Sequence, residues 1–224
     1  MNNQEIFKTL NIKEPFSHVK HLNIESAGSF NWGGNADIFD FLITQKSPTL
    51  IIELGTFLGD SAITMAKSIR KNNLNCSIIC VDTWLGSKEH WLTTECNLLS
   101  LFNNFETGTS ELYYKFIKNV IDHKVDDIII PMPTTTNIAF EVLKSLNIKA
   151  DLIYIDADHT EQMVYNDLKN YSGLLSDNGT IFGHDINWQS VQTAVNRYCM
   201  DSNKKWIEHK DSTTNRIKFW EIVI

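Results

Sequence analysis

Hydrophobic and polar residues follow a repeating order along most of the chain. Short runs that are almost wholly apolar have the composition of strands buried on both faces of a sheet. They occur at 49–55, 76–82, 127–132, 151–156 and 179–185. Beside them lie longer segments whose apolar residues recur every three or four positions, the spacing of an amphipathic helix. These segments are 35–46, 59–72, 110–121, 137–147, 160–175 and 189–200.

Two of the predicted helices have an apolar face that can be assigned residue by residue. In the helix at 59–72 the inward residues are Ala62, Ile63, Ala66 and Ile69. In the helix at 137–147 they are Ile138, Val142, Leu143 and Leu146. The closing runs KKWIEH and RIKFWEIVI predict a terminal pair of strands. Apolar strands that alternate with amphipathic helices predict an α/β fold with a doubly wound, mostly parallel sheet.

The length of 224 residues favours one compact domain with a small appendage. We expect a main domain at 35–224 and an N-terminal segment at 1–34 that covers the acceptor or the cofactor. The stretch 84–109 fits neither period, so we predict an insertion there, and long insertions in compact domains tend to be functional. Ligands of open α/β sheets bind outside the carboxyl ends of the strands. That rule places the residues ending four predicted strands on one rim: Gly55, Asp82, Asp156 and Asp185.

Charge and composition narrow the classes of partner. The 20 basic and 27 acidic residues give a net charge of −7, which opposes nucleic-acid binding because that needs a basic face. The N-terminal run MNNQEIFKTLNIKE has no basic region before an apolar one, and no apolar run approaches ~18 residues. We therefore expect a cytoplasmic protein without a membrane partner. The cysteines are expected to be reduced thiols: Cys76, Cys80, Cys96 and Cys199.

The run IIELGTFLGDS places Gly55 and Gly59 between the first main strand and the following helix. A dinucleotide fingerprint needs a glycine where Phe57 stands and another where Asp60 stands, so NAD and FAD are disfavoured, and no P-loop lysine follows. What remains suits a nucleoside ligand without phosphate. Asp82 closes the second main strand, near the spacing at which an acid binds ribose hydroxyls.

These residues resemble a known family. The run Glu53-Leu54-Gly55-Thr56-Phe57-Leu58-Gly59, followed by Asp82, resembles the first motifs of class I S-adenosylmethionine-dependent methyltransferases. The resemblance extends from about residue 49 to the end and implies a Rossmann-like seven-stranded sheet with an antiparallel C-terminal strand. It implies that the cofactor, S-adenosylmethionine, binds at Glu53, Gly55, Thr56, Gly59, Ser61, Asp82, Thr83, Trp84 and Asp156.

Polar residues end the fourth and fifth main strands, in the runs DLIYIDADHTE and GHDINW. If these strands are neighbours, Asp156, His159, His184 and Asp185 converge. Methylation of a hydroxyl needs a base for its proton, and a divalent cation can lower the hydroxyl's pKa. The pattern Asp-x-x-His resembles metal-dependent O-methyltransferases of sugars and natural products. The resemblance implies His159 as general base and Asp156 as metal ligand. The second motif departs from the family pattern, because His184-Asp185 stands in place of two acids, and these two residues are the further candidate ligands of an Mg²⁺ or Mn²⁺ site. We expect Asp158 to cap the next helix.

Several alternatives stay open. His184 stands where the related enzymes have an acid, so it is either a metal ligand or a second base in a site without metal. The expected acceptor is a small-molecule hydroxyl, first a sugar or glycan and second a phenolic or natural-product hydroxyl. The candidate platforms for it are Trp32, Trp84, Trp91 and Trp188, whereas Trp206 and Trp220 are expected in the core. An NAD-type oxidoreductase, a metal-dependent hydrolase and a silent binding module are more distant alternatives, and homo-oligomerisation is left open.

Overall fold

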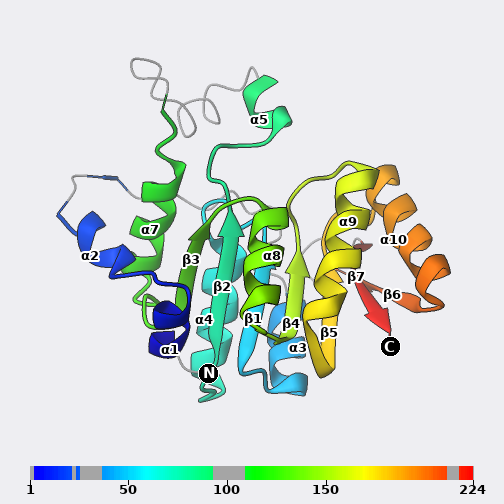
Figure 1. Cartoon of the computed structure of the whole chain (residues 1–224), viewed down its shortest axis with the longest axis horizontal. Coiled ribbons are helices and arrows are strands. Elements are labelled where there is room, and N and C mark those ends of the chain that lie inside the picture. Colours follow the sequence, from blue (N-terminus) through cyan, green and yellow to red (C-terminus); the bar gives the residue numbers. More distant parts are fainter. Residues whose placement is uncertain (1–2, 22–23, 26–36, 93–108, 211–216, 224) are drawn as a thin grey trace.

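The computed structural model of the chain describes residues 3–21, 24–25, 37–92, 109–210 and 217–223. Its centre is a seven-stranded sheet of order β3-β2-β1-β4-β5-β7-β6, in which β1 to β5 are parallel and β7 pairs antiparallel with β5 and β6 (Figure 1). The predicted α/β fold is therefore confirmed. The strands are β1 (Leu50–Leu54), β2 (Ser77–Asp82), β3 (Ile129–Pro133), β4 (Ala150–Ile155), β5 (Leu175–Gly183), β6 (Lys205–Lys210) and β7 (Ile217–Val223).

Helices cover both faces of the sheet. The longer ones are α3 (Asp37–Lys46), α4 (Asp60–Lys71), α7 (Leu112–Asp122), α8 (Thr136–Ser145), α9 (Glu161–Tyr171) and α10 (Gln189–Ser202). The shorter ones are α1 (Asn3–Thr9), α2 (Pro15–Val19), α5 (Lys88–Leu92) and the 3₁₀ turn η1 (Ser172–Leu174). Helices α3, α4 and α7 share one apolar core, while α8, α9 and α10 share the other on the opposite face. The strand β1 is buried along its whole length between these cores.

The inward face of α4 is as predicted, but that of α8 is not. Leu143 is fully buried, whereas Ile138 is 57% exposed, and Val142 and Leu146 also stand in solvent. The buried partner of Leu143 is Ala139, four residues before it. A helical pattern offers two neighbouring apolar rows here, and periodicity cannot tell which one faces the sheet. The small Ala139 side chain lets α8 approach the sheet closely along that row.

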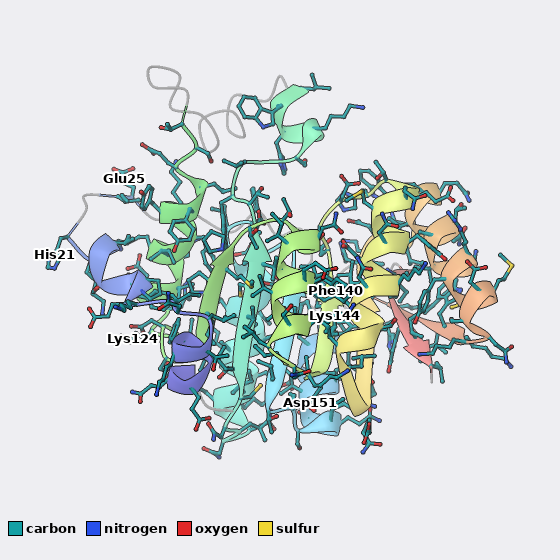
Figure 2. The ribbon with its side chains drawn as sticks, viewed as in Figure 1. His21, Glu25, Lys124, Phe140, Lys144 and Asp151 are labelled. Atoms are coloured by element: carbon teal, nitrogen blue, oxygen red, sulfur yellow. The ribbon has the colours of Figure 1, made fainter. Side chains whose placement is uncertain are left out.

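The parallel strands end together at the upper edge of Figure 1, and the order of connection reverses between β1 and β4. Such a reversal opens a crevice for ligands outside the carboxyl ends. The opposite end of the sheet is fastened by Asp151 (Figure 2), whose carboxylate accepts hydrogen bonds from the Thr49 backbone N–H at 2.7 Å and the Ser176 hydroxyl at 2.8 Å. Within the described ranges, no helix combines the length and apolar character needed to cross a membrane.

The predicted N-terminal segment and insertion are described only in part. From the segment 1–34, Ile6, Phe16 and Val19 are buried in the two cores. The insertion contributes α5, and residues 93–108 lie outside the described ranges, as do Trp32 and Cys96. Three cysteines are free and buried: Cys76, Cys80 and Cys199. The boundary between an N-terminal segment and a main domain remains a prediction.

Candidate functional site

A cavity of about 750 Å³ lies at the carboxyl ends of the parallel strands, within the size range of small-molecule sites. Most of its lining comes from the ends of β1, β2, β3, β4 and β5 and from the loops that follow them. The predicted site residues in this lining are Gly55, Thr56, Ser61, Asp82, Thr83, Asp156, His159, His184 and Asp185. Glu53, Gly59 and Trp84 are not among the residues that line it.

The turn after β1 passes directly against the end of β4. Gly55 has φ +84°, and a Cβ placed on it would lie 2.1 Å from the carbonyl oxygen of Asp156. Its backbone N–H donates to the carbonyl of Val81 at 2.9 Å, and the N–H of Asp156 donates to the carbonyl of Leu54 at 2.8 Å. Both the left-handed conformation and the close backbone approach require glycine here. This contact forms the floor of the cavity.

Glu53 lies beneath that floor and orients two hydroxyl groups that line the cavity. Its carboxylate accepts hydrogen bonds from the hydroxyls of Thr56, at 2.7 Å, and of Ser61. Glu53 is fully buried, and this burial raises its pKa to about 7 despite those two bonds. When Glu53 is ionised, both hydroxyl protons point toward it, so Thr56 and Ser61 present oxygen lone pairs to a ligand. Glu53 therefore acts on the cavity through these two side chains.

Asp82 joins the loops after β1 and β2. One carboxylate oxygen accepts the backbone N–H of Phe57 at 2.8 Å and the other accepts that of Trp84 at 2.7 Å. Burial raises the pKa of Asp82, although these backbone bonds lower it. The indole of Trp84 is 1% exposed, donates to the carbonyl of Phe57 at 2.8 Å and stacks on Phe116. Trp84 therefore supports the wall of the cavity from the core, and its ring is no platform for an acceptor.

Asp156 is held by a residue that we did not predict. The buried Tyr154 donates its hydroxyl to Oδ2 of Asp156 at 3.0 Å. Tyr154 precedes Asp156 by two positions along the chain, which places both side chains on one face of the strand. That spacing is the signal by which sequence analysis could have found it. The bond leaves Oδ1 of Asp156 facing the two histidines.

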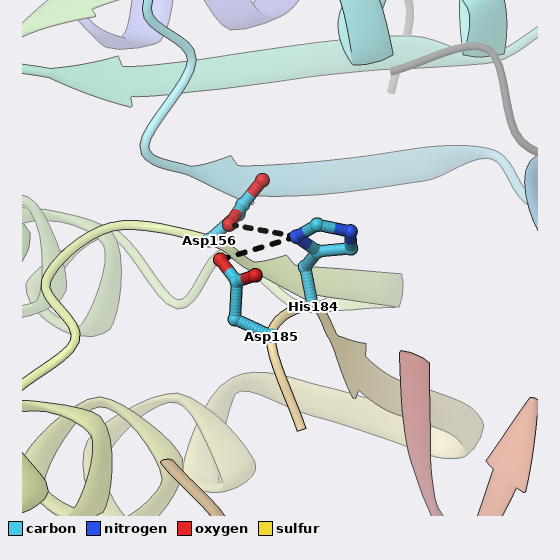
Figure 3. A group of neighbouring side chains, drawn as sticks. All are labelled: Asp156, His184 and Asp185. Atoms are coloured by element: carbon cyan, nitrogen blue, oxygen red, sulfur yellow. Dashed lines mark ion pairs between the residues drawn. The ribbon is translucent and has the colours of Figure 1, made fainter. Parts of the chain in front are cut away.

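Two imidazoles and two carboxylates converge where β4 and β5 end, and Figure 3 shows three of these side chains, those of Asp156, His184 and Asp185. Nδ1 of His184 lies 3.7 Å from Oδ1 of Asp156 and 3.2 Å from Oδ2 of Asp185. Nε2 of His159 lies 2.9 Å from the same Oδ2 of Asp185 and 3.9 Å from Oδ1 of Asp156. Asp185 reaches this position from a left-handed backbone, with φ 54°. The convergence expected from the sequence is therefore present.

Charge pairing dominates the titration of this cluster. Burial lowers the pKa of His159, but the carboxylates of Asp156 and Asp185 raise it by more, to about 10. Burial also lowers the pKa of His184, and Asp185 and Asp156 again outweigh it, so the net direction is upward. Burial by itself would raise the pKa of Asp185, but the two histidines hold it well below its usual range.

The same cluster offers ligands for a metal ion. One ligand atom from each of Asp156, His184 and Asp185 can be chosen so that all lie within 4.8 Å of one another. Two carboxylates with an imidazole suit Mn²⁺, Fe²⁺ or Zn²⁺ better than Mg²⁺, which prefers oxygen ligands. The donor set therefore fits a divalent ion. However, Nε2 of His184 is buried without a hydrogen-bond partner, whereas histidine ligands usually donate their second N–H.

Aromatic side chains line the outer part of the cavity. Trp188 is 43% exposed and lies over His159, with 4.7 Å between ring centroids. On the other side, His90 from α5 stacks on Phe57 at 5.4 Å and lines the cavity. His90 is not among the residues predicted for the site, and it reaches the cavity because the chain after β2 folds back over the loop after β1. Lys218 from β7 also lines the cavity and was not predicted.

Two further expectations concern residues at the margins of the site. Trp220 is fully buried, as expected for a core residue, and its indole donates to the carbonyl of His184 at 2.9 Å. It thereby fixes the backbone beside Asp185. Asp158 accepts the backbone N–H of Thr160 at 2.6 Å, but Thr160 is itself the N-cap residue of α9, so Asp158 forms the turn before the helix and does not cap it as expected.

Comparison with known proteins agrees with this geometry. The sequence profile of the family described as a methyltransferase domain matches residues 52–186, and no curated protein matches the chain. The fold is similar to that of an O-methyltransferase from Bacillus cereus in complex with SAH, with 15% identity, a TM-score of 0.59 and coverage of 99% of this chain and 96% of that one.

Two other solved structures are similar over almost their whole length. The O-methyltransferase TomG from Streptomyces achromogenes is 11% identical, with a TM-score of 0.57 and coverage of 100% of this chain and 96% of that one. The calicheamicin methyltransferase CalS11 is 12% identical, with a TM-score of 0.60 and coverage of 98% and 93%. These likenesses show the shared fold. Since the family profile spans more than half of the sequence, this chain belongs to the methyltransferase domain family.

Proposed function

We propose that the protein is an S-adenosylmethionine-dependent O-methyltransferase that acts on a hydroxyl of a small molecule, most favourably a sugar or glycan. The observation that carries this proposal is the distance of 2.9 Å between Nε2 of His159 and Oδ2 of Asp185. Both residues line the same cavity as Asp156 and Gly55. The proposed base, its partner carboxylate and the glycine turn proposed to bind the cofactor therefore line one cavity. The similarity to O-methyltransferases, one with bound SAH, supports it.

The described lining of the cavity suits a cofactor that carries a positive charge. Its acidic residues are aspartates that outnumber the one lysine: Asp60, Asp82, Asp156, Asp158, Asp167 and Asp185. A sulfonium ion without phosphate is favoured in such a field, whereas a pyrophosphate is not. In this proposal the methionine part lies against Gly55, Thr56 and Ser61, and Asp82 binds the ribose. This arrangement also disfavours NAD-type chemistry.

When bound, the cofactor supplies an electrophilic methyl group on sulfur. Nε2 of His159 faces Asp185, so the acceptor hydroxyl would give its proton to the other ring nitrogen, Nδ1, as its oxygen takes the methyl group from the sulfur. Asp185 stabilises the imidazolium that forms, as a buried carboxylate beside a general base does. A divalent ion held by Asp156, His184 and Asp185 would lower the pKa of the hydroxyl.

The high pKa of His159 links the base to ligand binding. With its pKa near 10, His159 holds a proton at neutral pH in the ligand-free cavity. A cation bound beside Asp156 and Asp185 competes for the same carboxylates and so lowers the pKa of His159. The base is then free to accept a proton only after the cationic ligand has bound.

Trp188 favours a flat or ring-shaped acceptor, because its exposed indole borders the cavity next to His159. A sugar ring fits this surface, and a phenolic or natural-product hydroxyl, methylated without a metal, is the alternative. A metal-dependent hydrolase could use the same aspartates and histidines, but it would leave the turn at Gly55 and the carboxylate of Asp82 without a role.

Binding of S-adenosylhomocysteine to the purified protein, measured by calorimetry, tests the proposal. We expect a single site, and Asp82→Ala should weaken binding by about tenfold or more because charged hydrogen bonds to the ribose are lost. Asp177→Ala, at an exposed position, is the matched control and should bind as the wild type does. Absence of binding, or an unchanged affinity in Asp82→Ala, contradicts the proposal. Transfer of labelled methyl to a panel of sugars and phenols then identifies the acceptor class.

A further inference from the structure

Asp167, on α9, is a buried carboxyl that the reaction described above does not use. It is 1% exposed, and its Oδ1 has no hydrogen-bond partner within the described residues. Among the described residues, Nε2 of His184 is also buried without a partner, and it lies at the chemical end of the site. An unpaired buried carboxyl oxygen is costly, so a native protein keeps one mainly where a ligand completes it. Asp167 is also part of the lining of the cavity.

Its place along the cavity indicates which part of the ligand it meets. The sheet order β3-β2-β1 places the loop after β3 one strand beyond Asp82 as seen from Gly55. That loop contributes Thr134, Thr135 and Thr136 to the lining. A cofactor whose methionine lies at Gly55 and whose ribose lies at Asp82 therefore directs its base toward these threonines.

Helix α9 brings Asp167 to the same corner. The hydroxyl of Tyr171 donates to the carbonyl of Thr136 at 2.7 Å, and Asp167 precedes Tyr171 by four residues, on the same face of the helix. A hydrogen bond with the side chain of Thr136 lowers the pKa of Asp167, but burial raises it by more, to about 7. The carboxyl thus bonds toward α8 through one oxygen, and Oδ1 is the oxygen that has no partner.

We propose that Oδ1 of Asp167 accepts a hydrogen bond from the exocyclic amino group of the cofactor's adenine and thereby selects adenine over other bases. This inference rests on the proposed function, because it needs the adenine of S-adenosylmethionine in the cavity. An amino group supplies the N–H donor that Oδ1 lacks. A base without that group leaves the buried oxygen unpaired, and such mismatches are strongly rejected.

A purely structural role is the competing explanation, since Asp167 also lies beside the start of α8. The two roles differ in a measurable coupling between Asp167 and the amino group of the ligand. We would measure by calorimetry the affinities of the wild type and Asp167→Ala for S-adenosylhomocysteine and for its analogue with hydrogen in place of the 6-amino group. Asp82→Ala is the control, because it should weaken both ligands equally and leave their ratio unchanged.

We expect loss of the amino group to weaken binding to the wild type by about tenfold, and to Asp167→Ala by about twofold or less. An equal ratio in both proteins, with a lower melting temperature of the variant, would show that Asp167 only supports α8 and overturn the inference. If Asp167→Ala does not fold, the wild type still decides, because equal affinities for both ligands are incompatible with the contact. Failure of the wild type to bind S-adenosylhomocysteine would instead remove the proposed function itself.

Discussion

Nε2 of His159, after β4, lies 2.9 Å from Oδ2 of Asp185, after β5. The two residues are far apart in the sequence and meet because β4 and β5 are neighbours, with Ile155 beside Gly183 in the register. A histidine paired with a carboxylate can take a proton from a hydroxyl and keep the resulting charge stabilised. Five predictions concern this pair and the residues that surround it.

His159→Asn should lower methyl transfer by about 100-fold or more, because general-base catalysis commonly contributes that much. The affinity for S-adenosylhomocysteine should change little, since the cofactor contacts proposed above do not include His159. Turnover and calorimetric affinity are measured on the same preparation. His21→Asn, at an exposed position, is the control and should behave as the wild type. A variant that retains turnover would exclude His159 as the base.

Asp185→Asn should lower the pKa of His159 in the ligand-free protein. Asp156 and Asp185 raise that pKa to about 10, so removal of one of the two charges should bring it down by about one unit or more. The sign follows because a neighbouring negative charge favours the protonated imidazole. An NMR titration of the histidine ring signals gives the value directly. An unchanged pKa would mean that Asp185 does not pair with His159 in solution.

Mn²⁺ should bind at Asp156, His184 and Asp185, as measured by electron paramagnetic resonance of the free ion. The three ligand atoms lie within 4.8 Å of one another, and the donor set suits this metal. Asp156→Ala should abolish binding, and methyl transfer should be lost in EDTA and return with Mn²⁺ or Mg²⁺. If the wild type leaves Mn²⁺ free and EDTA has no effect, the metal-free alternative is correct, with His184 bonded to Asp185 through Nδ1–H.

Gly55→Ala should destabilise the fold and weaken cofactor binding together. The new Cβ would lie 2.1 Å from the carbonyl oxygen of Asp156, so the floor of the cavity must move, and φ +84° is unfavourable for alanine. Gly173→Ala is the matched control, because a Cβ there meets no atom within 4 Å. Thermal unfolding and calorimetry report the two effects. Equal melting temperatures for the two variants would contradict the close approach.

Stability should fall as the pH rises from about 5 to about 8, partly because of Glu53. Burial raises its pKa in the folded protein from 4.5 to about 7, so over this interval the folded state holds a proton that the unfolded state has lost. Its stabilising contribution is complete below about pH 4.5 and is lost as the pH rises through about 7. Glu53→Gln should reduce this loss of stability by about 3 kcal/mol at most. Denaturant unfolding at several pH values checks it.

The sequence was sufficient for the fold because each predicted strand and helix carries its own period. The start of β5 differs from the prediction. The strand begins at Leu175, four residues before the predicted run, and the sequence did not indicate this because exposed Asp177 and Asn178 interrupt the apolar pattern there. The inward row of α8 was also wrong, because Ile138 and Ala139 belong to adjacent rows that a period cannot distinguish. Such errors concern edges and faces, where local pattern ends and packing decides.

The residues of the candidate site likewise fall into those that the sequence could place and those that it could not. Gly55, Asp82, Asp156 and Asp185 could be placed on one rim from the sequence, because parallel strands carry their carboxyl ends to a common edge. His90, Lys218 and Asp167 could not, since each reaches the site through a contact between elements that no local pattern encodes. Trp84 lies inside the core for the same reason, as its ring packs on Phe116 from α7.

The sequence by itself determined the alternation of strands and helices, the glycine turn and the strand-end acids, since these depend on neighbours within a few residues. Only the tertiary structure decided that His159 pairs with Asp185 and that one oxygen of Asp167 lacks a partner. Distances between side chains of different strands depend on sheet register and helix packing. Those are set by the burial of the whole core, which no single segment specifies.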